Sequence, residues 1–463
     1  MFPFPSPDPN RNGTSGSYNG TPRSSEADRG LLGRALYLFA DVRRGEGVIA
    51  ILLTLNVFLL LTAYYLLKVS REPLILESGA EVKSYAAAGQ ALLLIPVVKL
   101  CDTLAHRVGR MKLLACVTLF FASNLLVFAF LFRLRVALGM PFYIWVGIFD
   151  VMMIAHFWSF ANDVYSPEQG KRLFAILGIG SSVGAVAGTR IAKLLFPPLG
   201  PGGLMVVAAG ILLVCLSLFQ IVHLRTSPVS RNDAHPEEPL SRECGFRLIL
   251  TNRYLLLIGV LSIVRNWVNT IGEYVLDRTL LRDAASHTSA TVSFHQYVAA
   301  FKADYFGWVN AIVLVFQLFF VSRILKHFGV TGALFVLPLI SLSGNLALSL
   351  MPLLSLSLTA KVAENSVDYS LQSTAGNALF LGESRDAKYK AKVMIDTFLV
   401  RFGDVLSAVG VWLGAVLRAQ TRHFTILNVG LAVAWLALVL TLRRERQQRI
   451  AHDPPVAGSM TYA

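Results

Sequence analysis

The chain has 463 residues, of which 54% are hydrophobic and 15% are charged, and its mean hydropathy is +0.57. Soluble domains carry about 25% charged residues, so this composition excludes a disordered chain and argues against a soluble enzyme. The formal net charge is +14. In a membrane protein, an excess of Lys and Arg residues indicates which loops lie on the cytoplasmic side of the membrane. We therefore do not interpret the charge as a sign of a nucleic-acid partner, and we expect none.

Apolar segments follow one another along most of the sequence, and each is long enough for a membrane-spanning helix of about 20 residues. Six lie before a polar stretch that begins at residue 226, and six lie after it. The tenth is the most polar and is easily missed in a hydropathy count. The predicted spans are 48–68, 85–104, 113–132, 141–163, 173–196, 204–224, 254–275, 305–323, 331–351, 353–380, 393–417 and 424–442.

These segments predict an all-α polytopic membrane protein with about 12 transmembrane helices in two six-helix halves. Residues 1–34 are rich in Pro, Ser, Gly and Asn and lack the apolar core of a signal peptide, so we expect a disordered tail. The predicted regions are this tail, an N-terminal half over 35–225, a cytoplasmic linker over 226–252, a C-terminal half over 253–442 and a C-terminal tail over 443–463.

Basic residues are distributed unequally between the two sets of loops. The loops on the side that holds both termini contain roughly twice as many Lys and Arg residues as the opposite loops. Because cytoplasmic loops are enriched in Lys and Arg, both termini are predicted to be cytoplasmic. Among the basic residues assigned to the opposite loops are Lys68, Arg71, Lys83, Lys193 and Lys302.

A short turn follows the second predicted span. It reads Asp102-Thr-Leu-Ala-His-Arg107-Val-Gly109-Arg110 and resembles the loop between spans two and three in the major facilitator superfamily. A weaker copy follows the eighth span, from Ser322 to Gly329. Matching features in two halves indicate an internal repeat. The resemblance implies a major facilitator-like fold, in which Asp102, Arg107, Gly109 and Arg110 would form a gating loop.

Charged residues interrupt several predicted spans at helical spacing. A charged side chain at the bilayer centre costs roughly 2.5–3.5 kcal/mol, so such residues should face a cavity or an ion-pair partner. Arg265, Asn269 and Glu273 recur at every fourth position and therefore share one helical face. Interhelical ion pairing explains any single residue equally well, but the whole set favours a polar central cavity for a hydrophilic solute.

Two groups of site residues are predicted from these positions, and no metal site is expected because the four cysteines lack metal-ligand spacing. The predicted substrate-binding residues are Lys68, Arg71, Asn162, Arg265, Asn269, Glu273, Lys361, Asp368 and Arg401; the predicted coupling or ion-pair residues are Asp150, Glu364, Asp396 and Asp404.

The fifth predicted span carries Gly180, Gly184 and Gly188 at every fourth position. A stripe of small residues permits two membrane helices to approach closely. We expect this face either to pack statically against a neighbour or to slide during transport.

Several segments resemble one transporter family. They are Tyr64-Tyr-Leu-Leu-Lys68-Val-Ser-Arg71-Glu72-Pro-Leu, the stretch from Phe157 to Phe174, and the stretch from Lys390 to Asp396. These segments are similar to the ATP/ADP translocases of plastids and obligate intracellular bacteria. In this comparison the first-span basic residue of the family is Arg71 and the seventh-span acid is Glu273. The family's fourth-span acid has Asp150 as its nearest counterpart, and its tenth-span base falls near Gly376, so the chain would be a divergent member.

The resemblance implies a secondary transporter that works by alternating access and moves or exchanges nucleotides or a related phosphorylated metabolite. It also implies a multi-pass protein of the bacterial inner membrane. We expect a monomer in the lipid bilayer, with a small-molecule solute and no cofactor. No Walker-type loop, GxxxxGK[ST], is present to drive transport by ATP hydrolysis, and no nucleophile–base constellation indicates an enzyme. The alternatives are a proton-coupled facilitator of another small solute or drug, and a non-transporting membrane scaffold.

Overall fold

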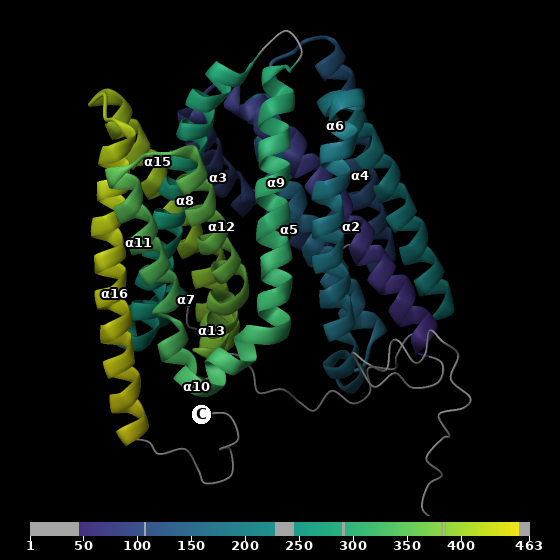
Figure 1. Cartoon of the computed structure of the whole chain (residues 1–463). Coiled ribbons are helices and arrows are strands. Elements are labelled where there is room, and N and C mark those ends of the chain that lie inside the picture. The colour runs from purple at the N-terminus through teal and green to yellow at the C-terminus, as the bar shows by residue number, and fades with distance from the viewer. Residues whose placement is uncertain are drawn as a thin grey trace, which may run out of the picture.

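The computed structural model describes residues 46–105, 108–226, 245–288, 292–380, 383–384 and 386–452. This part of the chain is helical, without strands, and its long helices run roughly parallel to one another (Figure 1). We call the end at which the first described helix begins and the last one ends the lower end, which is the bottom of Figure 1. The opposite end is the upper end. The predicted tail over 1–34 and most of the predicted linker lie outside the described residues.

Five helices form the N-terminal half, and the last of them is a hairpin. Gly200 has a positive φ of 65° and lies among Pro197, Pro198 and Pro201, which break the helix there. The two arms return to the same level of the first helix, because Gly180 abuts Thr54 and the Asn56 side chain donates a hydrogen bond to the Cys215 carbonyl. The helices are α2 (Gly47–Leu76), α3 (Ala80–Ala105), α4 (Arg110–Arg133), α5 (Gly139–Val164) and α6 (Pro167–Arg225).

The C-terminal half repeats this plan with more irregular helices. Its second span bends at Gly329, where φ is 67°, and the chain turns there into the next span. Several π-helical turns interrupt its later spans. The elements are α7 (Gly245–Thr251), α8 (Arg253–His287), α9 (Phe294–Val315), η2 (Phe316–Phe320), α10 (Val321–Ala333), α11 (Val336–Leu350), α12 (Leu354–Val367), η3 (Asp368–Gln372), α13 (Ser373–Ala378), η4 (Ala387–Ala391), α14 (Lys392–Met394), η5 (Ile395–Leu399), α15 (Val400–Val416) and α16 (Thr421–His452).

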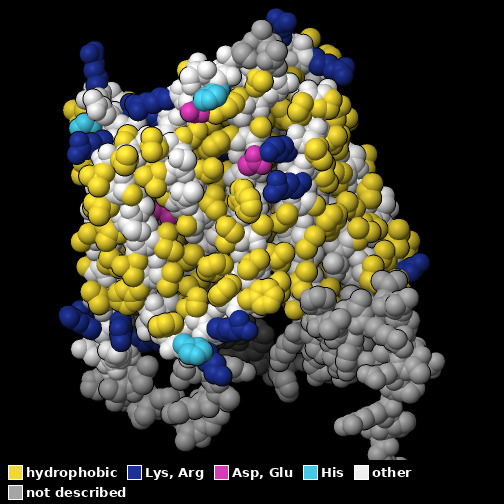
Figure 2. Space-filling model, viewed as in Figure 1, with side chains coloured by type: hydrophobic (Ala, Val, Ile, Leu, Met, Phe, Trp, Pro, Cys, Tyr) yellow, Lys and Arg dark blue, Asp and Glu magenta, His cyan; other side chains and the backbone are white. Residues whose placement is uncertain are grey.

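The predicted twelve spans are confirmed. Nine helical stretches in the described residues are long and apolar enough to cross a membrane, and the longest of them contains both arms of α6. The shorter apolar helix α11 and the polar run α12–η3–α13 supply the two remaining crossings. The chain is therefore a multi-pass membrane protein, and the face shown in Figure 2 is largely apolar between its two ends. The region boundaries differ in detail, because α7 falls within the predicted linker and α16 continues into the predicted C-terminal tail.

Several helices are longer at the upper end than the apolar pattern predicts. The first span was predicted to end at residue 68, but α2 continues to Leu76 and includes Arg71 and Glu72. The eighth was predicted to begin at 305, but α9 begins at Phe294 and includes Lys302. These charges interrupt the apolar run in sequence, yet they lie inside the protein with ionic partners.

The N-terminal half is built on the predicted glycine stripe. A Cβ at Gly184 would lie 2.4 Å from the Phe58 carbonyl oxygen, and one at Gly188 would lie 2.9 Å from Thr62 Cα. Gly180 abuts Thr54 in the same way. The close approach of α6 to α2 is confirmed, and it requires the absence of side chains on this face.

The two halves meet at the upper end and separate at the lower end. An apolar cluster joins them above, in which Ile75, Leu76 and Tyr143 pack with Ile271 and Tyr274. Below, an apolar cavity of about 440 Å³ lies between α6 and the α9–α10 segment. It is lined by Ala175, Gly178, Ile179, Ser182, Leu314, Gln317, Leu318, Val321, Ser322, Leu325 and Thr374. The molecule is therefore closed at its upper end and parted along one seam below.

Candidate functional site

A polar cavity of about 230 Å³ lies between the two halves. The N-terminal half contributes residues of α2, α3 and α5, and the C-terminal half contributes residues of α8, α9, α12, η3 and α15. A site at the interface of two repeats can be reached alternately from either side when the halves rock against each other. Its ionisable lining residues are Lys68, Arg71, Glu72, Lys83, Asp150, Glu273, Asp277, Arg401 and Asp404, together with five tyrosines.

Lys68 projects into this cavity among aromatic rings. Its Nζ lies 4.4 Å from the centre of the Phe306 ring, 5.3 Å from that of Tyr65 and 5.5 Å from that of Tyr64. Such contacts stabilise an ammonium group without using its N–H donors in ordinary hydrogen bonds. No ion pair or hydrogen bond to Lys68 is formed within the described part of the chain. Its donors are therefore available to an acceptor in the cavity.

Arg71 lies one helical turn above Lys68 on α2. Its guanidinium stacks over the Tyr143 ring of α5 at 4.3 Å, and its Nε lies 3.4 Å from Glu72 Oε1. Arg71 is therefore held both by the stacking contact and by an ion pair with Glu72, whose other oxygen contacts Lys83 and Lys302. Lys68 and Arg71 together make the α2 wall of the cavity basic.

A buried ion cluster, formed by Glu72, Lys83, Asp277 and Lys302, closes the cavity on its upper side. Lys83 Nζ lies 2.6 Å from Glu72 Oε2 and 2.8 Å from Asp277 Oδ2. Lys302 Nζ lies 2.5 Å from Asp277 Oδ1 and 3.6 Å from Glu72 Oε2. Glu72 and Lys83 belong to the N-terminal half, whereas Asp277 and Lys302 belong to the C-terminal half. The cluster therefore links the halves ionically where the apolar cluster links them by packing.

Glu273 forms a second network on the C-terminal wall. Its Oε1 accepts hydrogen bonds from the Tyr305 hydroxyl and from Asn365 Nδ2, the latter at 3.0 Å. Lys361 Nζ lies 3.9 Å from the same oxygen and is closer to Asn269 Oδ1, at 2.7 Å. The side chain of Glu273 is 22% exposed, so its carboxylate still reaches the cavity.

A third group of contacts in the C-terminal half surrounds Asp404, which its hydrogen-bond partners hold in one orientation. Asp404 Oδ1 accepts hydrogen bonds from Asn266 Nδ2 at 2.7 Å and from Thr270 Oγ1 at 2.9 Å. Its Oδ2 lies 3.3 Å from Arg401 Nη1. Arg401 is one-third exposed and lines the cavity. Both residues line the cavity, so this pair can contact a solute from the C-terminal half.

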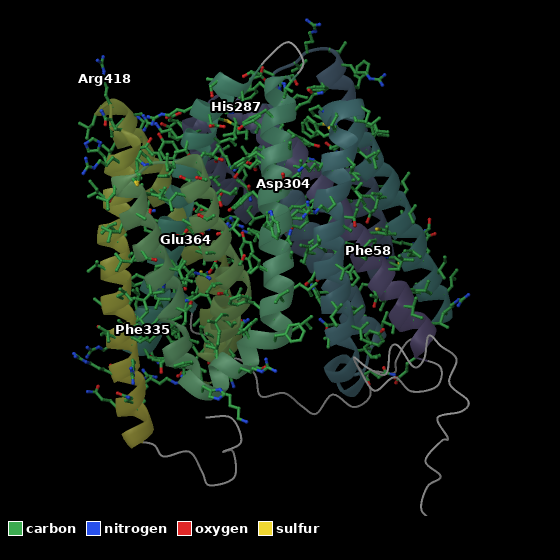
Figure 3. The ribbon with its side chains drawn as sticks, viewed as in Figure 1. Phe58, His287, Asp304, Phe335, Glu364 and Arg418 are labelled. Atoms are coloured by element: carbon green, nitrogen blue, oxygen red, sulfur yellow. The ribbon has the colours of Figure 1, made fainter. Side chains whose placement is uncertain are left out.

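Some predicted residues lie deeper in the C-terminal half. Arg265 Nη1 lies 2.9 Å from Asp368 Oδ1, and Lys361 Nζ lies 3.0 Å from Glu364 Oε2. Glu364 is buried within this half (Figure 3). The Arg265–Asp368 pair joins α8 to the tenth span, whereas the Lys361–Glu364 pair lies within α12, so the most polar span has partners inside the protein.

Other predicted residues are not brought to the cavity. Asn162 is exposed near the end of α5, and Asp396 is exposed on η5, where it pairs with Lys392 one turn away. Of the predicted gating loop, Gly109 is the N-cap residue of α4, and Arg107 lies outside the described residues. Asp102 and Arg110 belong to helix ends, but their side chains lie outside the described part.

Asp277, Lys83 and Lys302 escaped the sequence prediction. Lys83 and Lys302 were assigned to solvent-facing loops, but Lys302 is fully buried and Lys83 is 8% exposed. That assignment was wrong because each helix extends further than its apolar run. The stripe Arg265, Asn269 and Glu273 continues by the same interval to Asp277, and this periodicity was the signal that would have found the acid.

The comparisons with known proteins point to transporters, although no family model matches the chain. ADP,ATP carrier protein 1 of Chlamydia pneumoniae is 21% identical over 366 residues, which cover 67% of this chain and 69% of that protein. Its namesake from Chlamydia muridarum is 22% identical over 294 residues, 55% of this chain and 54% of that protein. The chain thus spans about two thirds of one of these carriers and about half of the other.

The solved structures that resemble the chain agree with these relatives on the fold. The POT family transporter PepTSo superimposes with a TM-score of 0.64 at 11% identity, over 87% of this chain and 99% of its own. The nucleoside transporter NupG gives 0.62 at 12% identity, over 86% of this chain and 99% of its own. The chain is therefore similar to ADP,ATP carrier proteins at 21–22% identity, and it has a major facilitator-type fold. These relatives and neighbours are transporters rather than enzymes.

Proposed function

We propose that the chain is a secondary transporter that moves an anionic solute, a nucleotide or a related phosphorylated metabolite, by alternating access. The observation that carries this proposal is Lys68, whose ammonium group is held among three aromatic rings without an ion pair in the described residues. It lies beside Arg71 in a cavity to which both halves contribute. Arg and Lys are the residues that bind phosphate groups, and the tyrosines beside them offer surfaces for a base to stack on.

The rest of the site divides into groups with different roles. Arg401, Asn269 and Glu273 line the cavity and would contact the solute from the C-terminal side. Lys361, Arg265 and Asp368 pair with residues of their own half and would position those contacts. The upper ion cluster would be the gate, since the upper end opens only when those ion pairs separate.

The orientation in the membrane follows from the basic loops. We place the protein in the bacterial inner membrane with both termini, and therefore the lower end, in the cytoplasm. The structure then corresponds to a state closed to the outside. The relatives from Chlamydia are named ADP,ATP carriers, and exchange of nucleotides across such a membrane is the form of transport that their name supports.

A second candidate is proton-coupled transport of the solute, and one observation favours it. Asp150 lines the same cavity, interacts electrostatically with Lys68 and Arg71, and has a buried oxygen, Oδ1, without a hydrogen-bond partner in the described residues. A carboxylate in this position could take up a proton when an anion enters. Uptake that collapses with an uncoupler, and that does not require nucleotide inside the vesicles, would favour this mode over exchange.

The experiment that tests the proposal is a thermal-shift screen of the purified protein against nucleotides, nucleosides and phosphorylated metabolites. A ligand that binds only the folded state stabilises it by about 2.7 kcal/mol at 100 times its Kd. We expect a phosphorylated ligand to raise the Tm of the native protein, but not that of Lys68→Ala. Lys99→Ala removes an exposed lysine of α3 and is the matched control. A ligand that shifts the native protein and Lys68→Ala equally would contradict the role given to Lys68.

A further inference from the structure

A group of charged side chains interrupts the apolar outer face of the protein away from the central cavity (Figure 2). It consists of Arg190 and Lys193 on α6 and Asp304 on α9, the last labelled in Figure 3. Lys193 Nζ lies 2.6 Å from Asp304 Oδ2, and Arg190 Nη1 lies 3.6 Å from Asp304 Oδ1. Two cations therefore share one carboxylate, and the group carries an excess positive charge.

These side chains face outward rather than into the protein. Their exposed fractions are 52% for Arg190, 41% for Lys193 and 36% for Asp304. A role in holding α6 against α9 does not require such exposure. The helices already meet at Gly307, where a Cβ would lie 3.2 Å from Thr189 Oγ1. Because about half of each cationic side chain is exposed, N–H donors of Arg190 and Lys193 remain accessible from outside the protein.

The depth of the group can be estimated from helix lengths. The helix from Phe294 to the bend at Gly329 is about 52 Å long at 1.5 Å per residue. It exceeds a hydrocarbon layer of about 30 Å by roughly 11 Å at each end when centred. Asp304 lies about 15 Å along this helix from Phe294, which places it about 4 Å inside the upper boundary. Arg and Lys side chains at that depth extend to the level of lipid phosphates.

The apolar cavity of about 440 Å³ described above lies lower in the same seam, between the same two helices. It is reached from Asp304 by following α9, η2 and α10 down to Leu314, Leu318 and Val321, a path of about 15–26 Å at 1.5 Å per residue. Since Asp304 lies about 4 Å inside the upper boundary, the cavity begins about 19 Å below that boundary, just past the middle of a hydrocarbon layer of about 30 Å. The part of a lipid from the upper leaflet that extends to this depth is the end of a long acyl chain. The apolar lining of the cavity suits a hydrocarbon chain.

We propose that the seam between α6 and α9 is a binding site for an anionic phospholipid. Its phosphate would be held by Arg190 and Lys193, and the end of one acyl chain would enter the upper part of the apolar cavity below. The cavity exists because the halves are parted at the lower end, so the lipid would bind this conformation in preference to one in which the lower end is closed. Bound lipid would therefore favour the state closed at the upper end. This inference does not depend on the identity of the transported solute.

The test measures the binding of phosphatidylglycerol to the purified, delipidated full chain by native mass spectrometry and by thermal shift. Phosphatidylcholine and inorganic phosphate are the comparison ligands. We expect phosphatidylglycerol to bind at least about tenfold more tightly than phosphatidylcholine, a difference of about 1.4 kcal/mol, and inorganic phosphate to give no shift. An equal shift from phosphatidylcholine would contradict the role of charge, and an equal shift from inorganic phosphate would contradict a lipid ligand.

Three variants locate the site. Arg190→Gln/Lys193→Gln should lose the preference for phosphatidylglycerol. Arg133→Gln/Arg422→Gln, which removes two exposed cations elsewhere at the upper end, should keep it. Gly178→Leu should weaken binding while leaving the charges intact, because no atom lies within 4 Å of a Cβ at Gly178 and the new side chain would occupy the cavity. Full binding by the first variant or by Gly178→Leu would overturn the proposal.

Discussion

Lys83 of the N-terminal half and Asp277 of the C-terminal half form a buried ion pair, with Nζ and Oδ2 2.8 Å apart. Asp277 is 1% exposed and also pairs with Lys302, which is fully buried. Buried ion pairs contribute little net stability, but removal of one partner leaves a charge without compensation and costs about 3–5 kcal/mol. The closed upper end therefore depends strongly on Asp277.

Asp277→Asn should destabilise the closed upper end. The substitution leaves Lys83 and Lys302 with only Glu72 and the more distant Glu273 as anionic partners. We expect faster labelling, from the upper side, of a cysteine placed at Ala87 in the cavity of an otherwise cysteine-free protein. Glu77→Gln is the matched control. It removes the exposed contact with His295, 3.1 Å long, which contributes about 0–1 kcal/mol. Unchanged labelling in a folded Asp277→Asn protein would show that the cluster is not the gate.

Glu273→Gln should lower transport while leaving the fold largely unchanged. The amide oxygen of the new side chain still accepts hydrogen bonds from Tyr305 and Asn365, so the network keeps its geometry. The negative charge near Lys361 and Lys302 is lost, and we expect uptake to fall at least about tenfold, equivalent to 1.4 kcal/mol. The melting temperature should change less than in Asp277→Asn, because Glu273 is partly exposed. A protein with native uptake would remove Glu273 from the transport site.

Gly184→Ala should destabilise the N-terminal half. The new Cβ would lie 2.4 Å from the Phe58 carbonyl oxygen, which is backbone and must be displaced together with α2. Overpacking of this kind costs about 1–3 kcal/mol. Gly178→Ala on the same helix meets no atom within 4 Å and is the control. The expected result is a lower melting temperature for Gly184→Ala alone; equal melting temperatures for the two variants would contradict close packing of α6 on α2.

The sequence predicted the number of spans and their division into halves, because apolar length is a property of the local chain. It also placed Lys68, Arg71, Glu273 and Arg401, which now line one cavity. It could not distinguish a charge that ends a helix from one that is buried with a partner. Lys83 and Lys302 are separated by more than two hundred residues, and their shared partner Asp277 becomes visible only when the halves are assembled.

Two residues that the sequence predicted for the site, Asp396 and Asn162, do not line the cavity, and the cause is related. Asp396 is an acid inside a predicted span, but it lies on the π-helical turn η5 and its side chain is exposed beside Lys392. Asn162 lies in a segment that resembles the translocases, but it is exposed near the end of α5. Periodicity assigns a face to each residue of a regular helix. It does not show where the helix changes its winding or which face meets the other half.

The most direct test of the account is nucleotide exchange in proteoliposomes. Vesicles loaded with unlabelled ADP and supplied with labelled ATP outside should accumulate label with the native protein and with Lys99→Ala. Lys68→Ala and Arg71→Ala should insert normally but lose accumulation, because the cavity then lacks the cations that hold the phosphates. Accumulation at the native rate by both cavity variants would contradict the assignment of Lys68 and Arg71 to the solute, and failure of every phosphorylated solute to exchange with the native protein would contradict the proposed function itself.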